Sequence, residues 1–210
     1  GTLRITNGSF RASLTDFLVG INRQPTRCVT RGTLDLRGAS LDAFEVSGNV
    51  RVGCGLTESS TNGYAEVLLP SGTLNIASNL FLGMTNTLSR GLLDLYGTTV
   101  RVQGTTIIER TGIVTARVYG VSAGLDILST NSSDFIIGEG GRVHLVFSQP
   151  APKVYALRMA GDQRALFESY KNNGRLTWQT SDGNTPEIVF DGTYTVVRYP
   201  PKAGTVLTIR

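Results

Sequence analysis

Charged residues are scarce in this chain: they make up 17% of its 210 residues, against about 25% in an average soluble protein. This low share excludes a charged helical bundle, and the 40% share of apolar residues excludes intrinsic disorder. No apolar run approaches the roughly 18 residues that a membrane-spanning helix needs, so we predict no membrane span. Glycine, in contrast, is abundant at 25 residues. Together these features predict an all-β protein with many turns.

Residues that ligate metals or form disulfides are also few. Cys28 and Cys54 do not form a CxxC pair, and the single histidine, His144, has no cysteine or carboxylate at ligand spacing, which argues against a zinc site. His144 lies in a β run and is predicted to be a packed strand residue. The even cysteine count fits a Cys28–Cys54 disulfide in an oxidising compartment, and two buried free thiols are the alternative.

The excess of positive charge is small and dispersed. The net charge is +4, and the basic residues, mostly arginines, form no tight run with interleaved aromatics. We therefore predict a solvated basic surface and no nucleic-acid partner.

Two short phrases recur along the chain. The first reads GTLRI, GTLDL, GTLNI and GLLDL at residues 1–5, 32–36, 72–76 and 91–95. The second reads DFLVG, NVRVG, NLFLG and DFIIG at residues 16–20, 49–53, 79–83 and 134–138. A variable strand lies between them, for example at residues 40–46 and 99–103. Alternating segments closed by Gly, Asn or Ser are typical of strands and turns.

The repeats keep their strand lengths while the intervening segments vary, as in a solenoid. We therefore predict a parallel β-solenoid, with a sandwich or jelly roll as the rival architecture. Coil stacking would place one side chain of each first phrase in a single outward column, and the expected inward pairs are Leu3/Ile5, Leu34/Leu36, Leu74/Ile76 and Leu93/Leu95. The outward column would read Arg4, Asp35, Asn75 and Asp94.

The pattern changes near Gly141, which divides the chain into three predicted parts. Residues 1–140 form the solenoid coils, residues 141–198 a strand-rich C-terminal cap, and residues 199–210 a Pro-Pro spacer followed by a terminal strand. The cap contains the one convincing helix, near residues 162–172, with Asp162 as its expected N-cap.

The phrases GTLNI, NLFLG and GLLDLYGTTVRVQG resemble the autotransporter-associated β-strand repeat. Similar repeats occur in secreted bacterial proteins with PEP-CTERM-type sorting tails, many of them planctomycete or verrucomicrobial. Residues 143–194 also resemble the C-terminal module of such proteins, although Met159 replaces the usual Trp and the sorting tail is absent. The resemblance implies an extracellular or cell-surface location and a structural or adhesive role, and it carries no catalytic residues. We predict no signal peptide within these residues, and Gly1 fits either the residue after a cleaved signal or a fragment boundary.

Catalytic patterns are absent from the sequence, so we predict no enzyme activity and no cofactor. A glycosidase needs two carboxylates about 5–9 Å apart, yet Asn75 would separate Asp35 from Asp94, and neither Asp42 nor Glu45 has a matching acid one coil later. Two N-glycosylation sequons begin at Asn7 and Asn131. Most aromatics lie inside apolar strand phrases, including Phe17, Phe44, Phe81, Phe135 and Phe147.

Two functions remain. The first is an extracellular structural protein that polymerises head to tail, with itself as partner. The terminal phrase would lend a strand to the next copy, and the edge of the first coil would accept it. The donor residues are Gly204, Thr205, Val206, Leu207, Thr208 and Ile209, and the acceptor residues are Thr2, Leu3, Arg4, Ile5 and Thr6. The alternative is a β-helix that binds or cleaves carbohydrate, with cell-surface polysaccharide as the partner; exposed aromatics in a groove would favour it.

Overall fold

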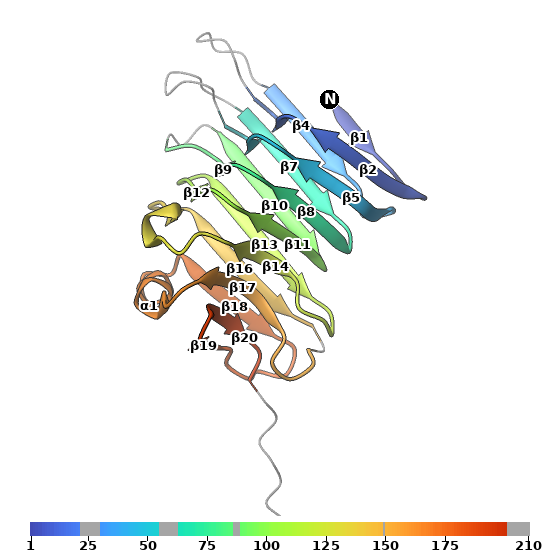
Figure 1. Cartoon of the computed structure of the whole chain (residues 1–210). Coiled ribbons are helices and arrows are strands. Elements are labelled where there is room, and N and C mark those ends of the chain that lie inside the picture. The colour runs from blue at the N-terminus through green and yellow to red at the C-terminus, as the bar shows by residue number, and fades with distance from the viewer. Residues whose placement is uncertain (22–29, 55–62, 86–88, 149, 201–210) are drawn as a thin grey trace, which may run out of the picture.

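The computed structural model describes the whole chain except residues 22–29, 55–62, 86–88, 149 and 201–210. It confirms the predicted fold: a parallel β-solenoid with one short α-helix near its C-terminal end (Figure 1). Each of the first five coils contributes one strand to each of three sheets, here called A, B and C.

The three sheets differ in strand length and in how they end. Sheet A is parallel throughout and runs β1 (Thr2–Arg4), β4 (Thr30–Asp35), β7 (Gly63–Leu69), β10 (Arg90–Tyr96), β13 (Gly112–Val118), β16 (Arg142–Phe147) and β18 (Leu176–Thr180). Sheet B runs β2 (Ser9–Leu14), β5 (Ser40–Val46), β8 (Gly72–Ile76), β11 (Thr98–Val102), β14 (Gly124–Ile127), β17 (Tyr155–Ala160), β20 (Tyr194–Arg198) and β19 (Glu187–Phe190). Sheet C runs β3 (Phe17–Val19), β6 (Val50–Val52), β9 (Leu80–Leu82), β12 (Thr106–Ile108) and β15 (Phe135–Ile137).

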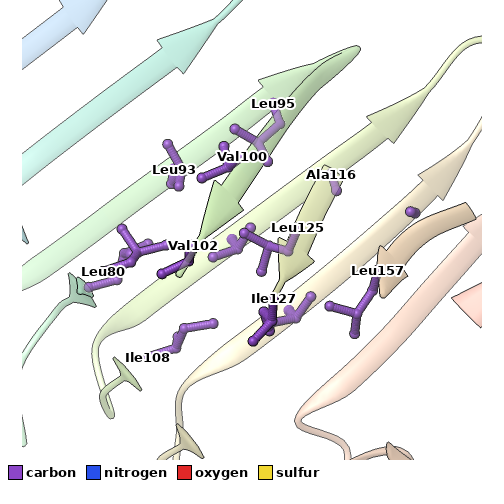
Figure 2. Close-up of a cluster of buried hydrophobic side chains, with 14 of the residues drawn as sticks. Leu80, Leu93, Leu95, Val100, Val102, Ile108, Ala116, Leu125, Ile127 and Leu157 are labelled. Carbon is purple, nitrogen blue, oxygen red and sulfur yellow. The ribbon is translucent and has the colours of Figure 1, made fainter. Parts of the chain in front are cut away.

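The core forms because alternate residues of every strand face the interior and stack on the same position one coil away. In sheet A one inward column holds Leu34, Val67, Leu93, Val114 and Val143, all in register and nearly fully buried. Figure 2 shows aliphatic side chains from successive coils filling this interior, among them Leu93, Val100, Leu125 and Ile127. Each such side chain stabilises the fold by roughly 1.5–3 kcal/mol relative to its exposed state.

The second sequence phrase forms sheet C, and its polar first residue has a definite role. Asp16 Oδ1 accepts a hydrogen bond from Asn49 N (2.7 Å), and Asn49 Oδ1 accepts one from Asn79 Nδ2 (2.9 Å). Asn79 Oδ1 then accepts one from Thr105 N (2.8 Å), and Thr105 Oγ1 donates to Asp134 Oδ1 (3.2 Å). The corner before sheet C therefore carries a ladder of side chains that bonds each coil to the next.

The glycine that closes the phrase is required for two reasons. Gly20, Gly53 and Gly83 have φ values of +62°, +63° and +67°, a region that other residues rarely adopt. The backbone of a neighbouring strand also passes very close: a Cβ on Gly53 would lie 2.1 Å from the Arg90 carbonyl oxygen. At Gly20, Gly53 and Gly83 the turn from sheet C towards sheet A therefore needs a residue without a side chain, whereas after β12 the corresponding residue is Glu109.

The first phrase does not form one column, so that prediction was wrong. Residues 72–76 do not form a strand of sheet A but β8 of sheet B. In that sheet Asn75 is in register with Glu45 of β5 and Arg101 of β11. The position between Asp35 and Asp94 belongs to Leu68 of β7, a strand that lies in one of the segments of variable length between the phrases. Leu74 and Ile76 do face inward, but from sheet B.

The C-terminal region continues the solenoid before closing it. The strands β16 and β17 pair in parallel with β13 and β14, and antiparallel pairing begins only with β20. The helix α1 (Arg164–Asn172) lies where it was predicted, and a 3₁₀ turn, η1 (Ser132–Asp134), precedes β15. The expected N-cap was wrong by one residue: Gln163 occupies that position and makes no side-chain capping bond. The Asp162 carboxylate, one residue earlier, accepts bonds from the Arg164 backbone N–H (3.3 Å) and guanidinium.

Candidate assembly site at the N-terminal end

The first coil leaves one edge of every sheet without a partner strand in the described part of the chain. The strands β1, β2 and β3 are the terminal strands of sheets A, B and C, and each pairs only with the strand of the second coil. The predicted acceptor segment, Thr2 to Thr6, contains β1. Its bonds to the second coil include Ile5 N to Asp35 O at 2.9 Å, which leaves its other side open.

The apolar interior is also exposed at this end. Leu3 is 56% exposed, whereas Leu34, its in-register neighbour in the second coil, is 6% exposed. Phe10 and Phe17 are only partly buried and pack edge-to-face on the fully buried Phe44, with ring centroids 5.1 and 5.2 Å apart. An open sheet edge beside uncovered core residues is a surface that proteins normally block.

The opposite end of sheet C is blocked by the helix. Phe167 and Tyr170 of α1 are buried against Phe135. The Tyr170 hydroxyl donates to Phe135 O (2.9 Å) and accepts from Ile137 N (3.2 Å), and Arg175 Nη1 donates to Ile137 O (2.8 Å). Three side-chain bonds thus replace the strand that would follow β15. Sheet B ends in the antiparallel pair β20–β19, with β19 as its terminal strand, and sheet A ends at β18.

A charged cluster stands next to the acceptor segment. The Asp35 carboxylate contacts Arg4 Nε (3.1 Å) and Arg37 Nη2 (2.9 Å). The hydrogen bonds from Arg37 lower the pKa of Asp35 to about 2, so the carboxylate stays ionised at all physiological pH values. Arg37 also lies over the Tyr96 ring, 5.5 Å from its centroid. The cluster fixes the first two coils of sheet A to each other on their outer face.

The predicted donor strand, residues 204–209, and Cys28 lie outside the described residues. Cys54 is a free thiol in the structure and is 3% exposed, with Sγ 3.4 Å from Val52 O and 3.2 Å from Phe81 O. The structure therefore does not support the predicted Cys28–Cys54 disulfide, because it places Cys54 in the packed interior without a bonded partner.

Burial raises the pKa of the Cys54 thiol to about 11, which predicts a slow reaction with iodoacetamide. At pH 8 the thiolate fraction falls more than about a hundredfold below that of an ordinary cysteine with a pKa near 8.5. We expect Cys54 to stay unmodified in the folded protein and to react within minutes in guanidinium without reductant, as followed by peptide mass. If the unfolded protein reacts with iodoacetamide only after a reductant is added, Cys54 is in a disulfide and this prediction is wrong.

The carboxylates that the glycosidase hypothesis considered lie on the outer faces, and each has a hydrogen-bond partner. Asp94 is held by Arg117 (Nε–Oδ1 2.9 Å), as Asp35 is by Arg37. Glu45 accepts from Asn75 Nδ2 (2.8 Å), and Asp42 lies 3.3 Å from the Ser40 hydroxyl. Among the described residues no group of three His, Cys, Asp or Glu side chains could hold a metal ion.

His144 lies on the outer face of β16 and is half-buried rather than packed in the core. Its Nδ1 is 3.0 Å from Thr177 Oγ1 of β18, and burial lowers its pKa. At the two sequons, Asn7 accepts from Gly8 N (2.8 Å) and Asn131 caps η1 by accepting from Ser133 N (3.1 Å).

Sequence reasoning missed one outer-face cluster. Arg31, Tyr64 and Arg90 stand in register on β4, β7 and β10 and line a surface pocket together with Thr33, Glu66 and Leu92. The alternation of residues 63–69 signals β7 and could have revealed Tyr64, which is 41% exposed. Phe81 also faces outward, from sheet C, with Arg51 4.1 Å from its ring centroid.

Comparisons with known proteins returned nothing: no protein-family model, no curated protein and no solved structure matches the chain. The resemblance to the autotransporter-associated repeat stays a prediction. No helix in the described ranges has the length and apolar character to span a membrane.

Proposed function

We propose that this protein is an extracellular structural subunit that assembles head to tail into filaments or a surface matrix. The observation that carries the proposal is the asymmetry of the two ends. The first coil leaves an unpaired strand edge on all three sheets and exposes the apolar Leu3. At the other end α1 covers the edge of sheet C, and sheet B ends in an antiparallel pair instead of a parallel coil. The extracellular location rests on the sequence resemblance.

The proposed contact is a lent strand. Residues 204–209 alternate, so an extended conformation would put Leu207 and Ile209 on one side, suited to the open apolar end beside Leu3. Main-chain hydrogen bonds to β1 would supply affinity, as in other strand-addition complexes. The contact joins two different surfaces and does not close, so repetition builds a fibre.

A second form of the same assembly is direct stacking of one copy on the next. Sheet A ends in an edge strand on both sides within the described ranges, with β1 at one end and β18 at the other. The edge of β18 in one copy could therefore continue the parallel sheet onto β1 of the next.

Deletion of residues 202–210 tests the lent strand. The deletion keeps Tyr199, because its ring is buried against Phe147 (centroids 6.1 Å apart) and its backbone bonds to Val154 O (2.8 Å). We expect the intact chain to form fibres at high concentration and the shortened chain to remain a folded monomer, as measured by negative-stain microscopy and sedimentation velocity.

Two point variants separate strand pairing from a nonspecific tail effect. Leu207→Asp should abolish fibres, because it would place a charge against the apolar interior, whereas Thr208→Asp on the opposite side should leave them largely intact. Fibres from the shortened chain would contradict strand lending and favour β18–β1 stacking. An intact chain that stays monomeric at all concentrations would contradict the assembly function itself.

A further inference from the structure

We infer that the outer face of sheet A carries a binding site for an acidic polysaccharide, centred on Arg31, Tyr64 and Arg90. This site is separate from the proposed assembly contact and does not depend on it. It gives the carbohydrate-binding alternative a defined position on the molecule.

The first step is the charge of the site. Several arginines on these outer faces are paired with aspartates: Arg4 and Arg37 with Asp35, Arg117 with Asp94, and Arg101 and Arg158 with Asp126. Arg11 and Arg142 are exposed and have no ion pair among the described residues, but neither has an arginine and a tyrosine beside it in register as Arg31 and Arg90 do. Arg31 and Arg90 form no ion pair within the described residues, and both are exposed. Two uncompensated guanidinium groups on one face favour an anionic ligand, which each can bind through paired hydrogen bonds.

The second step is the spacing of these groups. Arg31 pairs in register with Tyr64, and Tyr64 pairs with Arg90, so the two arginines stand on strands two apart, about 9.6 Å from each other. Arg31 lies over the Tyr64 ring, 5.5 Å from its centroid, and this contact helps to orient the guanidinium. A polymer with repeated acidic groups could contact both arginines at this strand spacing.

The third step distinguishes a sugar from other polyanions. The same pocket contains the Glu66 carboxylate, the Thr33 hydroxyl and the apolar side chain of Leu92. The carboxylate and the hydroxyl can accept hydrogen bonds from the hydroxyls of a sugar ring, which the phosphodiester groups of DNA do not offer. Leu92 offers an apolar surface to the C–H face of a sugar ring. Uronic acid residues, which combine carboxylate, hydroxyls and an apolar ring face, fit this set of groups.

Calorimetric titration of the intact protein with a galacturonic acid oligomer tests the inference. We expect saturable binding by the acid oligomer and none by its methyl ester, which has the same ring but no charge. Arg31→Gln and Arg90→Gln should each weaken binding by about tenfold or more, because each removes a charge-assisted contact. Arg11→Gln is the matched control, because Arg11 is an exposed arginine on sheet B with no ion pair among the described residues.

Three results would overturn the inference. One is the absence of binding by the acid oligomer at millimolar concentration. Another is equal or tighter binding of inorganic polyphosphate or short single-stranded DNA, which would identify the face as a nonspecific basic surface. The third is an equal loss of affinity in Arg11→Gln and the two sheet A variants. Circular dichroism of each variant would establish that it retains the fold.

Discussion

Replacing Gly53 by alanine should destabilise the protein by about 3–5 kcal/mol, near the upper end for a single substitution. The left-handed backbone, with φ +63°, costs about 1–2 kcal/mol for a residue with a Cβ. The larger part of the loss comes from the new methyl group, which would stand 2.1 Å from the Arg90 carbonyl oxygen and push β10 away. Urea unfolding followed by circular dichroism measures the change.

Gly120 provides the matched control for this substitution. Its φ is +77°, but a Cβ there would meet nothing within 4 Å. Gly120→Ala should therefore lose only the backbone contribution, about 1 kcal/mol. Equal losses at Gly53 and Gly120 would mean that the approach of β10 places no constraint on the turn.

Replacing Asp126 by alanine should cost about 3–5 kcal/mol, because removing one member of a buried ion pair leaves the other charge without compensation. Asp126 is fully buried, and both its oxygens accept hydrogen bonds of 2.6 Å from Arg158. Arg101 Nε adds a third contact at 3.4 Å. Arg158 itself is held between two rings, with its guanidinium 4.9 Å from the Tyr155 centroid and 4.5 Å from that of Tyr194.

The exposed pair of Asp162 and Arg164 is the comparison for this prediction. Both side chains face solvent, with 44% and 57% exposure, although the pair has bidentate geometry like that of Asp126. Asp162→Ala should leave the unfolding midpoint close to that of the parent protein, because exposed pairs contribute little. If the two aspartate variants unfold at the same urea concentration, burial does not determine how much an ion pair contributes to the free energy of unfolding.

The phrase that forms sheet C could be predicted because its end residues are chemically specific. The ladder needs Asp or Asn at positions such as Asn49, and the turn needs glycine at Gly53. The first phrase carries no such requirement: alternating strands of sheets A and B have the same pattern, and only the partner strand distinguishes them. Residues 72–76 were therefore assigned to the wrong sheet.

The pocket around Tyr64 was missed for a related reason. Its residues come from three strands separated by segments of irregular length, and only the register of β4, β7 and β10 brings them together. The contact of Tyr170 with the edge of sheet C is equally non-local, since its hydroxyl forms hydrogen bonds with Phe135 and Ile137, more than thirty residues away in sequence.

The position of Tyr170 and Arg175 late in the chain also affects the order in which the coils can fold during synthesis. Every coil bonds only to its neighbours, so the coils up to β15 can stack as they are synthesised, before α1 exists. Until Tyr170 and Arg175 are synthesised, the outer edge of β15 has no hydrogen-bond partners from these residues, and it is exposed like the edge of β3. On the nascent chain sheet C therefore has an unpaired strand edge at both ends, whereas on the finished chain α1 covers one of these edges.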